Sequence, residues 1–198
     1  MGAIELTWRP LDSTSAPLIR RAKAGDREAF EALLVRHERV VLRTALRLMG
    51  RLDLAQDAAQ EVFLRLHKYL GRFDEERELG PWLYRMVVNV CHDQRRRRAR
   101  TEASLPLDEV DGSDPALAVP ADAEARLDRE RRRELVARAL QTLPEKERAA
   151  LVLRDVEGLA TREVARILGS SEATVRSQVS TGRVKVKKQV EKWLKERP

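Results

Sequence analysis

The chain has 198 residues, of which 36% are charged and 4% aromatic, and its net charge is +7. This length allows one domain or two small ones, and the excess of positive charge suits a polyanionic partner better than a small-molecule pocket. The single cysteine, Cys91, excludes an intrachain disulfide, and three scattered histidines argue against a four-ligand zinc site. No apolar run approaches the ~20 residues of a membrane span and no signal peptide is visible, so we expect a cytoplasmic protein without membrane insertion.

The N-terminal half predicts helices after an extension, residues 1–16, that we expect to be disordered. From Arg27 to Met49 apolar residues, with His37 among them, recur at the 3.6-residue spacing of a helix, and Gly50 is a natural stop. Asp53 is a suitable cap for a second amphipathic helix that ends at Gly71. These patterns predict a small helical bundle.

The third predicted helix combines an apolar stripe with a run of arginines. Pro81 suits its first turn, Cys91 falls on the buried stripe, and Tyr84 is expected to point elsewhere. Arg85 and Asn89 lie one turn apart on another face, so both can address a single unstacked nucleotide. The loop Gly71–Gly80 can form the wall of a base pocket. The cations that follow suit phosphates; they are Arg95, Arg96, Arg97 and Arg98.

An acidic segment separates the two halves of the chain. Residues 102–125 hold seven acidic residues, three prolines and no lysine or arginine, so the rest of the chain carries +14. Such a composition is typical of a linker, which we place at residues 101–125. Its charge also predicts a mimic of nucleic acid, although many linkers are acidic merely because they are solvated.

The C-terminal half predicts a helix-turn-helix. Helices are expected over Leu127–Leu140 and from Leu143 to Val156, followed by a short helix capped by Thr161, a turn at Gly169 and a second helix capped by Ser171. The second helix would enter the major groove with its N-terminus first. Gly182 predicts that this helix ends or bends nearby.

Both halves together resemble one family, the extracytoplasmic-function sigma factors of the sigma-70 family (group 4). The stretch "DLAQDAAQEVFLRLHKYLGRFD" resembles the segment that binds the polymerase clamp, and "ELGPWLYRMVVNVCHDQRRRR" resembles the reader of the −10 promoter element. "LQTLPEKERAALVLRDVEGLATREVARILGSSEATVRSQV" is similar to the reader of the −35 element. The resemblance departs at Leu79, where the family has phenylalanine, and after Ser177, where further cations are usual.

The resemblance implies an all-α fold with two small helical domains, at residues 17–100 and 126–198, joined by the flexible acidic linker. It implies −10 contacts by Arg85, Asn89 and the four arginines named above. It implies −35 contacts by Ser171, Thr174, Arg176, Ser177, Gln178, Thr181 and Arg183. It also implies that the polymerase-binding face consists of Asp57, Gln60, Glu61 and Arg65.

The implied function is to bind core RNA polymerase, at its beta-prime clamp and beta flap, and to direct promoter-specific initiation on duplex and melted DNA. An anti-sigma factor, often at the membrane, is the further partner that the family implies. We expect neither a cofactor nor a bound metal, and no catalytic constellation is visible, so the chain is not expected to be an enzyme. The alternative is a helix-turn-helix regulator whose N-terminal helices form a dimerisation or sensing domain.

Overall fold

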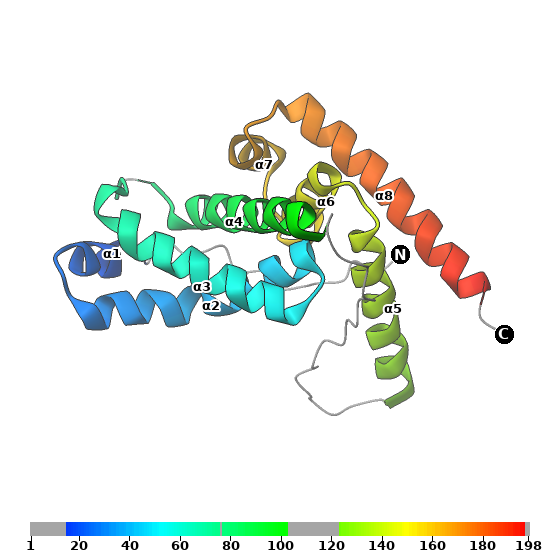
Figure 1. Ribbon diagram of the computed structural model, residues 1–198, viewed down its shortest axis with the longest axis horizontal. Helices are drawn as coiled ribbons and strands as arrows, with labels where there is room; N and C mark the ends of the chain where they lie inside the picture. Colours follow the sequence, from blue (N-terminus) through cyan, green and yellow to red (C-terminus); the bar gives the residue numbers. More distant parts are fainter. Residues whose placement is uncertain (1–14, 76, 103–122, 197–198) are drawn as a thin grey trace.

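The computed structural model describes residues 15–75, 77–102 and 123–196, and these residues form helices and connecting turns without any strand (Figure 1). The predicted all-α fold class is therefore confirmed. The extension up to residue 14 and most of the acidic linker lie outside the described residues. Within the predicted linker 101–125, the helix before it continues to Glu102 and the helix after it begins at Ala123.

The first half of the molecule is a bundle of helices in which α3 packs on both α2 and α4. Asp26 caps α2 by accepting a hydrogen bond from the Ala29 N–H at 3.0 Å, and Gly50 ends that helix in a left-handed conformation with φ of 79°. The elements are α1 (Ala16–Lys23), α2 (Arg27–Met49), α3 (Leu52–Tyr69), the 3-10 turn η2 (Leu70–Arg72) and α4 (Leu79–Glu102).

The second half contains the predicted helix-turn-helix. Gly169 forms the turn with φ of 60°, and the Ser171 hydroxyl caps the second helix by accepting a hydrogen bond from the Thr174 N–H at 3.1 Å. Val175 and Val179 are buried and anchor this helix. The elements are α5 (Ala123–Gln141), α6 (Glu145–Leu151), the π-helical turn η3 (Val152–Val156), α7 (Thr161–Leu168) and α8 (Glu172–Lys195).

Two of the predicted caps are wrong by one or two residues. The cap of α3 is Arg51, and Asp53 lies in the first turn, where it forms an ion pair with Arg51 at 2.6 Å. The cap of α7 is Ala160, whose N–H donates to Glu163 Oε2 at 2.8 Å, so Thr161 is the first helical residue. At α7 the Glu163 side chain satisfies the cap N–H in place of the predicted Thr161 hydroxyl, whereas the α3 cap has no side-chain hydrogen bond.

The expected end of the recognition helix at Gly182 is also wrong, because α8 continues to Lys195. Gly182 is buried, and a Cβ placed on it would lie 3.5 Å from Leu151 Cδ2 and 3.6 Å from Leu143 Cδ1. The packing of α8 on α6 outweighs the weak helix propensity of one glycine. Further along α8, the Arg138 guanidinium of α5 lies 4.9 Å from the centre of the Trp193 ring.

The two halves pack directly on each other. Helix α7 lies against α4, and α2 contacts α5, α6 and η3, so one hydrophobic cluster extends through both halves (Figure 1). Tyr84, which the sequence analysis directed away from the core, is 2% exposed, and its hydroxyl donates to Glu157 Oε2 at 3.2 Å. That prediction is wrong because the partner of Tyr84 belongs to the other half of the chain.

Candidate docking and nucleic-acid surfaces

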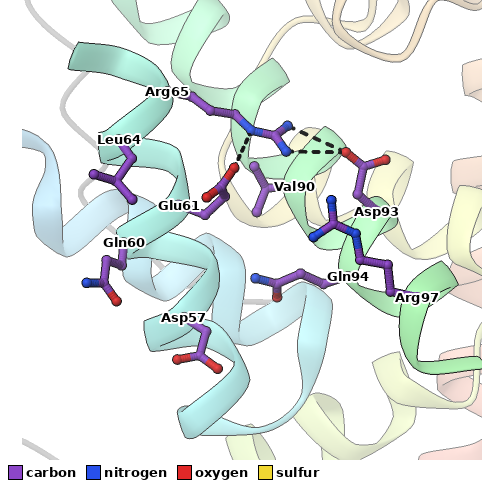
Figure 2. Close-up of a pocket in the computed structure, with 9 residues that line it drawn as sticks. All are labelled: Asp57, Gln60, Glu61, Leu64, Arg65, Val90, Asp93, Gln94 and Arg97. Carbon is purple, nitrogen blue, oxygen red and sulfur yellow. Dashed lines mark hydrogen bonds and ion pairs between the residues drawn. The ribbon is translucent and has the colours of Figure 1, made fainter. Parts of the chain in front are cut away.

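The four residues expected to bind polymerase lie together on α3 and line one side of a groove (Figure 2). Arg65 Nε donates to Glu61 Oε1 at 2.8 Å, and its terminal nitrogens lie 3.5 Å from Asp93 Oδ2 on α4. Asp57 and Gln60 are exposed and do not point at this ion-pair cluster (Figure 2). The α4 side of the groove is formed by Val90, Asp93, Gln94 and Arg97.

This groove presents both charged groups and apolar surface to a partner. Leu64 is 60% exposed at its edge, one turn from Gln60 on the same helix. Among the described residues that line the groove, the three carboxylates of Asp57, Glu61 and Asp93 outnumber the two cations, Arg65 and Arg97. The surface therefore suits a partner that offers basic groups around an apolar contact.

The candidate −10 surface lies on a different face of α4. Arg85 and Asn89 are exposed one turn apart, while Leu83, Met86, Val87 and Val90 of the same helix are buried. Because the buried side chains hold the helix in the bundle, the two polar side chains are presented to solvent from a rigid element. This is the arrangement that the sequence predicted.

The loop before α4 is attached to the bundle. The Phe73 ring packs on Trp82 with their centres 4.8 Å apart, and Lys23 of α1 donates to the Phe73 carbonyl at 3.0 Å and pairs with Glu75 at 2.8 Å. Leu79, the departure from the family pattern, is 4% exposed and begins α4. Leu79 thus belongs to the core, as does Phe73, which is 6% exposed.

The arginine run does not act as one surface. A terminal nitrogen of Arg95 donates to the Leu48 carbonyl at 2.8 Å and to Gln141 Oε1 at 2.9 Å, and burial lowers the pKa of its guanidinium. Arg96 and Arg97 are exposed, and Arg98 is half-buried. In this arrangement Arg95 holds the end of α2, whereas Arg96 and Arg97 are presented to solvent.

The residues expected to read the −35 element differ in how far their side chains are exposed to solvent. Thr174, Ser177 and Thr181 are exposed on α8, while Gln178 is half-buried. Arg176 forms an ion pair with Glu172 at 2.9 Å.

The Arg183 guanidinium makes more hydrogen bonds to a carboxylate than the Arg176 guanidinium does. It makes a bidentate pair with Asp155, at 2.7 and 2.6 Å, and this pair raises the pKa of the Arg183 guanidinium. A DNA phosphate would therefore have to compete with Asp155 for Arg183.

Two charged residues that the sequence analysis passed over are almost completely buried. Arg148 is 3% exposed and donates to four backbone carbonyls, and Glu157 is 2% exposed and accepts hydrogen bonds from three side chains. Their local sequence gave no signal of burial, because Arg148 directly follows the charged residues Glu145, Lys146 and Glu147, and Glu157 follows Arg154 and Asp155 closely.

Among the residues that the structure describes, no helix is long and apolar enough to cross a membrane. No group of three or more His, Cys, Asp or Glu side chains is placed to hold a metal ion within these same residues.

Comparisons with known proteins agree with both halves of the structure. The family model for Sigma-70 region 2 matches residues 33–101, and the model for Sigma-70 region 4 matches residues 133–186. The first match contains α3 and all but the last residue of α4, and the second contains α7 and the first part of α8.

Curated relatives cover nearly the whole chain. The ECF RNA polymerase sigma factor SigM of Mycobacterium tuberculosis (strain Erdman) is 36% identical over 176 residues, covering 88% of this chain and 84% of SigM. RNA polymerase sigma-H factor of Pseudomonas aeruginosa is 30% identical over 183 residues, covering 90% of this chain and 95% of sigma-H. The ECF sigma-E factor of Escherichia coli K12 is 29% identical over 186 residues, covering 92% of this chain and 97% of sigma-E. The chain therefore belongs to the extracytoplasmic-function sigma factors of the sigma-70 family.

Solved structures show the same fold. CnrH, in complex with the cytosolic domain of CnrY, superposes with a TM-score of 0.63 and 27% identity, covering 91% of this chain and 98% of CnrH. RpoE of Bartonella quintana, in complex with the anti-sigma factor NepR, gives a TM-score of 0.67 at 22% identity, covering 82% of this chain and 96% of RpoE.

Proposed function

We propose that this chain binds core RNA polymerase and directs it to promoters through −10 and −35 recognition and strand opening. The observation that carries the proposal is the presence, in order on one chain, of region 2 and region 4 of the sigma-70 family. A plain helix-turn-helix regulator would need only the second of these regions. RNA synthesis itself belongs to the core enzyme in this proposal.

The polymerase-binding surface that we propose is the α3 face of the groove. Its exposed Asp57, half-buried Glu61 and exposed Leu64 suit a basic coiled coil of the clamp. The beta flap would be bound by the second half. These contacts leave the Asn89 face of α4 accessible to DNA.

The nucleic-acid surfaces that we propose are the Asn89 face of α4 and the first turns of α8. Asn89 offers both a donor and an acceptor to the edge of an unstacked base, and Arg85 lies one turn away for the same nucleotide. Arg96 would face phosphates of the melted strand, whereas Arg97 lines the groove on α3 and α4. On α8 the exposed Thr174, Ser177 and Thr181, with Arg176 beside them, would meet the major groove.

An anti-sigma factor is a further proposed partner. CnrH was solved in complex with the cytosolic domain of CnrY, and RpoE in complex with the anti-sigma factor NepR. We propose that a protein of this kind covers the α3 groove and so competes with polymerase.

The test is reconstitution with core polymerase. The purified chain should form a 1:1 complex with core enzyme and should support run-off transcription from a subset of genomic promoters. If the chain instead forms a homodimer that binds DNA and does not bind core polymerase, it is the helix-turn-helix regulator.

A further inference from the structure

The segment that joins η2 to α4 is buried at its base and exposed at its turn. Phe73 is 6% exposed, and its N–H donates to the Leu70 carbonyl at 3.0 Å. Asp74 and Arg77 are exposed; the Arg77 N–H donates to the Asp74 carbonyl at 3.0 Å, and their side chains form an ion pair at 3.0 Å. We call the described residues of this segment, 71–75 and 77–78, the α4 loop.

A lysine of α1 holds the base of the α4 loop. Lys23 Nζ donates to the Phe73 carbonyl at 3.0 Å and lies 2.8 Å from Glu75 Oε1. The Lys23 and Glu75 side chains are 24% and 32% exposed, so solvent and salt screen this pair less than an ion pair on open surface. Lys23 therefore attaches the loop through its backbone and through a side chain, 50 residues further along the sequence.

Helix α1 is a firm support for this lysine. It packs on α2 and on η2, at the end of the bundle where α3 ends, and its Ile19 is 2% exposed (Figure 1). Lys23 is the last residue of the helix. Because the helix is anchored by its buried face, displacing the Lys23 ammonium group requires either a different side-chain rotamer or a shift of the whole helix.

The α4 loop lies at one end of the candidate −10 surface. The Phe73 ring packs on the Trp82 ring with their centres 4.8 Å apart. Trp82, Arg85 and Asn89 follow at i, i+3 and i+7, so they share one stripe of α4. Side chains of a helix lean toward its N-terminus, so Arg85 and Asn89 lean toward the end of α4 that the loop precedes.

A pocket that selects one base needs a wall that stays in place. Displacement of a binding group by about 1 Å is enough to lose most of its selectivity, and loops with few buried contacts open easily unless they are anchored. Lys23 supplies such an anchor. It also offsets the charge of the Glu75 carboxylate, which would otherwise repel the phosphates of a melted strand.

We infer that Lys23 is a positioning residue for −10 recognition: its contacts with the Phe73 carbonyl and with Glu75 hold the α4 loop in place as one wall of the pocket for the unstacked base. This inference rests on the proposed function for the base pocket. The attachment of the loop by Lys23 is a property of the chain alone and has its own measurement.

The first measurement is amide hydrogen exchange, followed by NMR on the full chain. K23M keeps the aliphatic stem of the side chain and removes its three donors. It should raise the exchange rates of the Phe73 and Arg77 amides about tenfold, the value of one hydrogen bond to a charged group at a partly exposed site. K23R should restore slow exchange, because arginine can also donate to both a carbonyl and a carboxylate.

Two further variants separate the contacts of Lys23. E75Q removes the ion pair and keeps the bond to the Phe73 carbonyl, so it should raise the exchange rates less than K23M does. R21M is the matched control, because Arg21 lies on the same helix and pairs with Asp26 at 2.7 Å. It should leave the exchange of the α4 loop unchanged.

The second measurement is base selectivity during transcription. Core polymerase with each variant is tested on a set of promoters that differ by one base in the −10 element, and run-off transcripts are compared. K23M should reduce the preference for the best base about tenfold at one position of the element, while core binding stays unchanged. A general loss of stability would instead lower transcription from all promoters alike. K23R should restore the preference.

The outcomes of the two measurements distinguish the steps of the inference. Unchanged exchange in K23M would overturn the attachment of the loop by Lys23. Faster exchange with unchanged base preference would overturn its role in −10 recognition, as would equal losses on all promoters. A parent chain that never binds core polymerase would refute the proposed function and with it the −10 role, whereas the exchange result would still decide the attachment.

Discussion

At the scale of single residues, burial in the core changes the pKa and therefore the protonation state of a side chain. His37 is 0% exposed, and neither of its ring nitrogens has a hydrogen-bond partner among the described residues. Burial therefore lowers the pKa of His37 to about 4, with Arg36 contributing further. His37 behaves as an apolar core residue at neutral pH, as its place in the helical period predicted.

The first prediction concerns acid sensitivity caused by His37. Between pH 6.5 and 4 the unfolded chain binds a proton at this ring while the folded chain does not, so stability falls as pH falls through that window. The pKa shift corresponds to a loss of up to about 3 kcal/mol. H37L should lose this component of the pH dependence. Urea unfolding at several pH values measures this component of the free energy of unfolding.

The second prediction concerns Asn89. N89A should weaken promoter opening by about tenfold, the value of one or two lost hydrogen bonds to a base, while polymerase binding is kept, since the residue is exposed on α4 outside the groove. Permanganate footprinting of the melted strand measures opening, and a pull-down measures polymerase binding. Unchanged footprints would show that Asn89 is not a base contact.

At the scale of elements, tertiary packing overrides local propensity in α8. The third prediction follows from the space at Gly182, where an added Cβ would make ordinary contacts with Leu151 and Leu143. G182A should stabilise the protein by ~1 kcal/mol and raise the melting temperature by roughly 2–4 °C. G169A is the matched control and should destabilise, because Gly169 has φ of 60°. A lower melting temperature for G182A would mean that the packing cannot accept a methyl group.

The fourth prediction concerns the α3 face. Reversing both Asp57 and Glu61 to lysine should reduce polymerase binding by at least about tenfold, because like charges would then face the basic partner. Circular dichroism should show unchanged helical content. The matched control reverses two exposed acids of α2, E31K with E38K, and makes the same change in net charge. A loss of helical content in the double variant would show that the Asp57–Glu61 pair is structural.

At the scale of the whole molecule, charge is divided unequally between the linker and the rest of the chain. The fifth prediction concerns the acidic residues of this linker, which lie outside the described residues. We expect the linker to occupy the RNA path of the polymerase and to be displaced by the growing transcript. Neutralising Asp108, Glu109, Asp111 and Asp114 should weaken holoenzyme formation at low salt, less so at high salt, and should change the yield of abortive transcripts. Equal behaviour of parent and variant across the salt range would make the segment a simple tether.

The sequence by itself determined the helices, the turn at Gly169, the cap at Ser171 and the candidate faces of α3 and α4. Each of these depends on residues within a few positions of one another, so periodicity and capping chemistry suffice to predict them. The family followed from two local motifs in the right order. Only the tertiary structure decided how the halves meet. Thr44 and Glu157 are 113 positions apart, and Arg148 reaches a carbonyl 100 positions away. No local pattern encodes such pairs, because a buried charge in a helix shows that a partner is needed but not where in the chain that partner lies.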